Sequence, residues 1–230
     1  MKIVLLHAFP LDERMWEPQR EALAEHELVT PNLYGLGGSS MNAWAQRLLR
    51  DVEGDLALVG ASMGGYVALA IARQAPERVR GFLLAGSRPD ADSPERRAGR
   101  ADTIRLIEEE GAAGLWENQR SKLFAEEAPE SAVDLAREMT LARTQDELVR
   151  AIAAIRDRQD NSGLLTSLAV PIVFANGAGD LFFPVEEARR FADGARNGRL
   201  VVFDGSRHLP SLEQPPEFNQ TLLELLQEAG

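Results

Sequence analysis

The chain has 230 residues, 44% of them hydrophobic, and its 36 Asp and Glu against 25 Lys and Arg give a formal net charge of -11. This acidic balance disfavours nucleic acid or an anionic membrane surface as the main partner. Because there is no cysteine and only three histidines (His7, His26 and His208), disulfides, thiolate sites and a histidine-rich metal centre are excluded. No segment has the length and apolarity of a signal peptide or a membrane span, so we expect a soluble, cytoplasmic protein.

Strands and helices alternate in the first part of the chain. Residues 3–6 and 27–30 have the pattern of buried strands, and the amphipathic segment between them predicts a helix over residues 15–26. The glycine-rich loop over residues 32–40 lacks the lysine of a P-loop and the G-x-G-x-x-G spacing, which disfavours nucleotide binding. A further helix is predicted over residues 42–53.

A sharp turn at Ser62 follows the next predicted strand, residues 56–59. Apolar residues 66–72 predict a helix directly after it, so the run Gly60-Ala61-Ser62-Met63-Gly64 has the strand-turn-helix context of a G-x-S-x-G nucleophile elbow. So tight a turn requires small neighbours, here glycines, and predicts a positive φ at the serine. Ser62 is therefore the candidate nucleophile, and the alternative is a Gly/Ser turn without chemistry.

The composition changes after the strand predicted at residues 79–85. Residues 88–158 contain no convincing strand, and they divide into helices predicted over 93–110, 112–124, 130–142 and 145–158. A helical insert above the end of a parallel sheet is where a lid would lie, with its inner face lining the substrate pocket. The residues expected to line that pocket are His7, Trp116, Phe124, Met139 and Leu209.

Strands return over residues 170–175 and 200–203. Alternating strands and helices predict a parallel sheet with helices on both faces, and functional loops then lie at the carboxyl ends of the strands. Asp180 follows the first of these two strands and His208 the second. Because His208 is the only histidine after Ser62, it is the single candidate for the general base.

Several carboxylates are candidates for the acidic partner of His208. Asp180 is preferred, because Asp204 lies only four residues before the histidine and reaches the far edge of the ring less easily. Asp90 and Asp92, which follow the strand at residues 79–85, are a third option.

The expected roles follow from elementary chemistry. A serine hydroxyl is a poor nucleophile at neutral pH, so His208 would take the Ser62 proton while the acid fixes the histidine tautomer. The developing oxyanion needs two N–H donors, for which the backbones of Phe9 and Met63 are the candidates.

These motifs resemble those of the α/β-hydrolase superfamily, essentially from end to end. Leu6-His7-Ala8-Phe9-Pro10 resembles its His-Gly oxyanion motif, Gly177-Ala178-Gly179-Asp180 its acid loop, and Gly205-Ser206-Arg207-His208 its histidine loop. Ala8 stands where the family has glycine, and its methyl group would narrow the approach to the Phe9 N–H.

The resemblance implies an α/β fold with a mostly parallel, doubly wound sheet that lacks the usual antiparallel first strand pair. The expected domains are a core of residues 1–87 and 159–230 and a helical lid of residues 88–158, inserted between the sixth and seventh strands in the family's numbering. The chain is most similar to small carboxylesterases, enol-lactonases and carbon–carbon bond hydrolases. The serine at position 62 disfavours a haloalkane dehalogenase, which has aspartate there.

We therefore expect a serine hydrolase that cleaves a small carboxylic ester through an acyl-enzyme. A lactonase or a carbon–carbon bond hydrolase would use the same triad, and a non-catalytic small-molecule receptor is the alternative from another class. The expected partner is a small-molecule ester or lactone. The resemblance implies no cofactor, and the sequence leaves the oligomeric state open.

Overall fold

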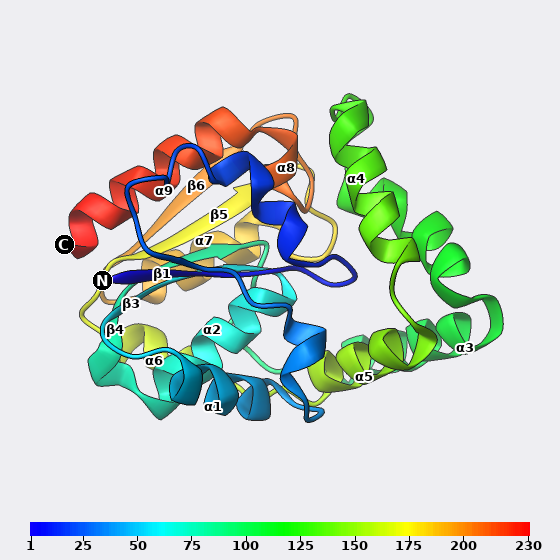
Figure 1. The fold of residues 1–230 in the computed structure, drawn as a ribbon, viewed down its shortest axis with the longest axis horizontal. Coiled ribbons are helices and arrows are strands. Elements are labelled where there is room, and N and C mark those ends of the chain that lie inside the picture. Colours follow the sequence, from blue (N-terminus) through cyan, green and yellow to red (C-terminus); the bar gives the residue numbers. More distant parts are fainter.

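The computed structural model describes residues 1–230 and contains one six-stranded sheet with helices on both faces (Figure 1). All pairings are parallel, in the order β2-β1-β3-β4-β5-β6. The strands are β1 (Lys2–Leu6), β2 (Leu28–Val29), β3 (Leu56–Ala61), β4 (Val79–Ala85), β5 (Ile172–Gly177) and β6 (Gly198–Phe203). The predicted α/β class is confirmed, and no antiparallel strand belongs to the sheet.

The two faces of the sheet hold separate apolar cores, because successive side chains of a strand point to opposite faces. In β1, Val4 and Leu6 pack into one core, whereas Ile3 and Leu5 pack into the other. The first core is covered by α1 (Met41–Asp51), α2 (Met63–Gln74), α6 (Ser162–Ser167) and α7 (Val185–Gly194). The second is covered by the 3-10 helix η1 (Glu13–Gln19), α8 (Pro210–Glu213) and α9 (Pro215–Ala229).

The helix predicted over residues 15–26 is wrong in type and length. The structure has η1 there, which ends at Gln19 and contains Pro18. Proline has no N–H to donate and its ring clashes with the preceding turn, so a regular α-helix cannot run through it. Trp16 and Leu23 are nevertheless fully buried, as the apolar pattern required. Two more 3-10 helices, η2 (Leu33–Leu36) and η3 (Pro76–Arg78), and the short helix α6 were not predicted.

Residues 94–156, in the connection from β4 to β5, form a helical insertion beyond the carboxyl ends of the strands, drawn in green in Figure 1. Its helices are α3 (Pro94–Leu123), α4 (Glu130–Leu141) and α5 (Gln145–Arg156). The predicted boundary at residue 111 is present as a break within α3, where Gly111 has φ 67° and ψ -159°. The insertion covers the edge of the sheet at which Ser62, Asp180 and His208 lie.

None of the helices in the structure combines the length and apolarity needed to cross a membrane.

Candidate active site

Ser62 occupies the sharp turn between β3 and α2. Its φ of 48° is the only positive φ at a non-glycine residue, as the motif predicted. Its backbone N–H donates to the carbonyl of Ala85 at 2.8 Å, and its own carbonyl accepts from the Ser87 hydroxyl at 3.0 Å. The end of β4 thus holds the strained conformation from both sides.

Three glycines make room for this turn. A Cβ would lie 2.4 Å from the Gly65 nitrogen if placed on Gly60, and 2.0 Å from the carbonyl oxygen of Leu6 if placed on Gly64. A Cβ on Gly65 would lie 2.1 Å from the Ser87 hydroxyl oxygen. Because real Cβ atoms do not approach other atoms this closely, each position requires glycine and the turn can place Ser62 above the sheet.

His208 and Asp180 form a buried pair at the same edge of the sheet. The Nδ1 atom of His208 lies 2.8 Å from Oδ2 of Asp180. The other carboxylate oxygen, Oδ1, accepts from the N–H groups of Phe182 at 2.8 Å and Phe183 at 3.1 Å. A carboxylate with three such partners holds one position, and because Nδ1 faces it, the Nε2 edge of the ring is left free for chemistry.

The other three candidate carboxylates, Asp204, Asp90 and Asp92, do not contact His208. Asp204 is exposed and does not contact the His208 ring. Asp90 accepts hydrogen bonds from Arg88 and Arg96, and Asp92 from Arg100 and Arg158. Of the four candidates, only Asp180 touches His208.

The loop that carries His208 is attached to the helical insertion. The His208 N–H donates to the carbonyl of Leu123, at the end of α3, at 3.1 Å. Glu213 accepts from the Ser206 hydroxyl at 2.7 Å and the Arg207 N–H at 2.9 Å through Oε1, and from the Ala125 N–H at 2.8 Å through Oε2. One buried carboxylate therefore fixes both the histidine loop and the segment that follows α3.

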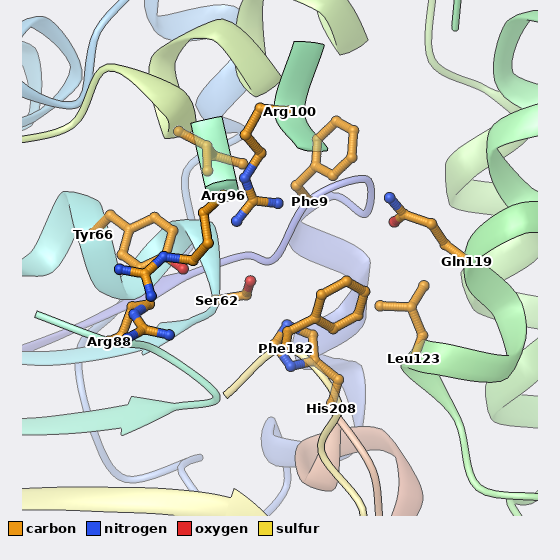
Figure 2. Close-up of a pocket in the computed structure, with 11 residues that line it drawn as sticks. Phe9, Ser62, Tyr66, Arg88, Arg96, Arg100, Gln119, Leu123, Phe182 and His208 are labelled. Carbon is orange, nitrogen blue, oxygen red and sulfur yellow. The ribbon is translucent and has the colours of Figure 1, made fainter. Parts of the chain in front are cut away.

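Ser62 and His208 face a common cavity between the sheet edge and the insertion (Figure 2). Its volume is about 30 Å³, which is roughly the space of one water molecule. The residues that line it are Phe9, Ser62, Tyr66, Arg88, Arg96, Arg100, Gln119, Leu123, Ile155, Phe182 and His208.

The lining was largely missed from the sequence, although two of its signals are local. Arg88 lies just beyond the carboxyl end of β4, at the edge where the functional loops gather. Arg96 and Arg100 are four residues apart, which places them on one face of a helix. Which face of α3 turns toward the serine depends on how the insertion packs, and that packing is tertiary.

None of the five residues predicted to line the pocket belongs to this cavity. Trp116, Met139 and Leu209 are buried in the second apolar core. Phe124 lies in the same core and borders a separate groove beside Arg207. Helical spacing marked Trp116, Phe124 and Met139 correctly as inward-facing, but they face the core instead of the cavity.

The fifth predicted pocket residue, His7, ties two loops together. Its Nε2 accepts from the backbone N–H of Leu33 at 2.9 Å, and Nδ1 contacts the carbonyl of Ala8 at 3.0 Å. The ring is fully buried, and burial lowers the pKa of His7 from 6.5 to about 4. At neutral pH, His7 is thus an uncharged structural residue.

Two backbone N–H groups near Ser62 have no acceptor within the protein. They belong to Phe9, which lines the cavity, and to Met63, the first residue of α2. Ala8 is fully buried in the second core, and its N–H donates to the Met15 sulfur at 3.1 Å. Ala8 therefore packs into this core and does not line the cavity.

No group of three or more metal-ligating His, Asp or Glu side chains is present in the structure. The chemistry that the site offers is instead that of a hydroxyl, an imidazole–carboxylate pair, two free N–H donors and three guanidinium groups around one small cavity.

Comparison with known proteins gives related hydrolases over nearly the whole chain. The chain is 27% identical to the pimeloyl-acyl-carrier-protein methyl ester esterase of Aromatoleum aromaticum, over 94% of each chain. A solved structure of a thermophilic esterase from Thermogutta terrifontis with malate bound is 31% identical, with a TM-score of 0.92 over 100% of this chain and 90% of that one.

A more distant structure shares the fold. The enol-lactonase from Burkholderia xenovorans LB400 has a TM-score of 0.85 at 22% identity, over 99% of this chain and 91% of its own. The sequence pattern of the Alpha/beta hydrolase family matches residues 3–221. The chain therefore belongs to the alpha/beta hydrolase family.

Proposed function

We propose that this protein is a serine hydrolase that cleaves small carboxylic esters through an acyl-enzyme intermediate. Ser62 is the nucleophile, His208 the general base and Asp180 the acid that orients it. The observation that carries the proposal is the placement of a strained serine and a buried His–Asp pair around one cavity. The esterases among the relatives support an ester-acting hydrolase.

In the first half of the reaction, the Ser62 oxygen bonds to the ester carbonyl carbon while His208 Nε2 takes the hydroxyl proton. The resulting tetrahedral intermediate breaks its bond to the alkoxy oxygen, which leaves as the alcohol with the proton from Nε2. Asp180 accepts the Nδ1–H throughout and stabilises the imidazolium, which its 2.8 Å contact allows.

In the second half, water attacks the acyl carbon of the ester on Ser62 and gives a proton to His208 Nε2. The second tetrahedral intermediate releases the carboxylic acid, and the proton returns to the serine oxygen. Both intermediates carry a negative oxygen, for which the free N–H groups of Phe9 and Met63 are the donors in this proposal. Loss of one such donor typically costs about 2.7–4 kcal/mol of activation free energy.

In this proposal the helical insertion, residues 88–158, acts as a lid over the cavity. It supplies Arg96, Arg100, Gln119 and further residues to the cavity, while the core supplies Ser62 and His208. Because the cavity is small, about 30 Å³, we expect the insertion or its side chains to move when an ester binds. The cavity then closes around the bound ester and excludes bulk water.

A fluorophosphonate probe tests the proposal directly. We expect one covalent adduct on Ser62 by mass spectrometry, and no adduct in Ser62→Ala. Hydrolysis of p-nitrophenyl butyrate should fall by about 10⁴-fold or more in Ser62→Ala and His208→Ala. Absence of labelling would favour a non-catalytic receptor. Faster turnover of a lactone or a β-diketone than of any ester would assign the same triad to a different bond.

A further inference from the structure

The cavity around Ser62 is lined by positive charge. Arg88, Arg96 and Arg100 contribute to its wall, and no Asp or Glu does. In Figure 2 the arginines gather on one side of Ser62, whereas Gln119 and Leu123 lie on the other. The protein as a whole is strongly acidic, with a net charge of -11, so this local excess of guanidinium groups is specific to the site.

Arg88 is held in place by carboxylates behind the cavity wall. Its Nε and one terminal nitrogen donate to the two oxygens of Asp90 at 2.6 and 3.0 Å, and the same terminal nitrogen donates to Glu187 at 2.6 Å. Burial by itself would lower the pKa of Arg88, but these two carboxylates raise it above its ordinary value. The guanidinium of Arg88 is thus charged and fixed in position beside Arg96 and Arg100.

Arg96 and Arg100 keep donors free for a ligand. One terminal nitrogen of Arg96 donates to Asp90 at 2.9 Å and to the carbonyl of Ala91 at 2.8 Å, and its Nε forms an ion pair with Asp92 at 3.3 Å. Arg100 uses its Nε, which donates to Asp92 at 3.2 Å. The second terminal nitrogen of Arg96 and both terminal nitrogens of Arg100 have no partner in the protein, and the two side chains are 30% and 21% exposed.

The arginines at the cavity and the side chains hydrogen-bonded to them carry a net positive charge. The side chains joined by hydrogen bonds are four arginines and three carboxylates: Arg88, Arg96, Arg100, Arg158, Asp90, Asp92 and Glu187. One positive charge therefore remains beside the cavity. A single carboxylate neutralises it, whereas a phosphate dianion would leave an excess of negative charge in a half-buried site.

The position of Arg96 adds an energetic argument. Ser93 is the N-cap of α3, so Arg96 lies in the first turn of the helix. The helix dipole disfavours a cation at this end and favours an anion. A carboxylate bound between Arg96 and Arg100 would relieve the unfavourable placement of the first and pair with the free donors of both.

We propose that the site selects esters that carry a second, ionised carboxyl group, which Arg96 and Arg100 bind while Ser62 attacks the ester carbonyl. This inference rests on the proposed function, because it names the substrate class of the same site. The carboxylate supplies orientation, and the ester bond broken and the proton transfers are those given above.

Matched pairs of methyl esters test the proposal. The probes are the monomethyl esters of succinic, glutaric and adipic acids, each compared with the ester whose free carboxyl is replaced by a primary amide of nearly the same shape. We expect wild-type kcat/KM to favour the acid over its amide by about 10- to 100-fold at one or more chain lengths, the range for hydrogen bonds to a charged group. A ratio near one at all three lengths would overturn the proposal.

Variants assign the selectivity to the two arginines. Arg96→Gln and Arg100→Gln should bring the acid-to-amide ratio toward one, and Arg100→Lys should keep part of it. The matched control is Arg105→Gln, which removes the same charge from α3 at an exposed position outside the cavity and should leave the ratio unchanged. An equal loss on both esters in Arg100→Gln would mean a structural role and refute the assignment.

A binding measurement separates this proposal from the proposed catalysis. Glutarate should slow fluorophosphonate labelling of Ser62 in wild type, and it should raise the Tm of Ser62→Ala but not of Arg96→Gln combined with Arg100→Gln. If the protein is labelled but glutarate neither protects nor stabilises it, only the carboxylate site is wrong. If glutarate stabilises Ser62→Ala but wild type neither reacts with the probe nor hydrolyses an ester, the carboxylate site stands and catalysis fails.

Discussion

Acidification should destabilise this protein through His7. The His7 ring is fully buried, and its Nε2 accepts the Leu33 N–H at 2.9 Å. Protonation would place a second N–H against that donor, in a site where burial already disfavours charge. The pKa of His7 is therefore lowered from 6.5 to about 4, whereas the unfolded chain keeps the ordinary value.

The sign follows from proton linkage. Between pH 6.5 and about 4 the unfolded chain binds a proton at His7 that the folded chain does not, so the free energy of unfolding falls as the pH falls through this range. The contribution is constant above the unfolded pKa and below the folded one. A difference of about 2.5 pKa units corresponds to roughly 3 kcal/mol over the whole window, of which about 2 kcal/mol is lost by pH ~5.

Urea unfolding followed by circular dichroism at about pH 7.5 and pH 5 measures the effect. The control is His7→Gln, which keeps an acceptor for the Leu33 N–H but takes up no proton in this range. We expect wild type to lose about 2 kcal/mol more than the control between the two pH values. Because the other titrating groups are common to both proteins, their contributions cancel in this difference. Equal losses in the two proteins would refute the reasoning.

Three further predictions concern the His–Asp pair. Asp180→Asn should lower kcat for ester hydrolysis by about 10⁴-fold, whereas Asp204→Asn should stay within about twofold in the same assay; similar losses in both would move the acid role away from Asp180. Gly86→Ala would place a Cβ 2.9 Å from the His208 Nδ1 atom. It should reduce kcat at least about tenfold with circular dichroism unchanged, and wild-type turnover would contradict the close packing. Glu213→Ala removes the acceptor of three hydrogen bonds and should lower the unfolding free energy by about 2–4 kcal/mol in urea titrations; an unchanged midpoint would show that the histidine loop does not depend on it.

The strands and the turn at Ser62 were predictable because their causes are local. A buried parallel strand is recognisable as a short apolar run, and the glycines around Ser62 are required by contacts within a few residues or with the neighbouring strands. The histidine was identified because the chain offers no other after Ser62. The failed helix at residues 15–26 also has a local cause, Pro18, which the amphipathic pattern concealed.

The sequence by itself therefore determined the sheet, the strained serine and the candidate partners Asp180 and His208, because short-range sterics and the common edge of a parallel sheet leave few arrangements. Only the tertiary structure decided which carboxylate touches His208 and which face of α3 lines the cavity. Those choices depend on how α3 rotates and packs above the sheet. Apolar spacing marks an inward face, but a core and a cavity wall have the same spacing. Trp116, Phe124 and Met139 therefore lie outside the cavity wall, and Arg96 and Arg100 line it instead.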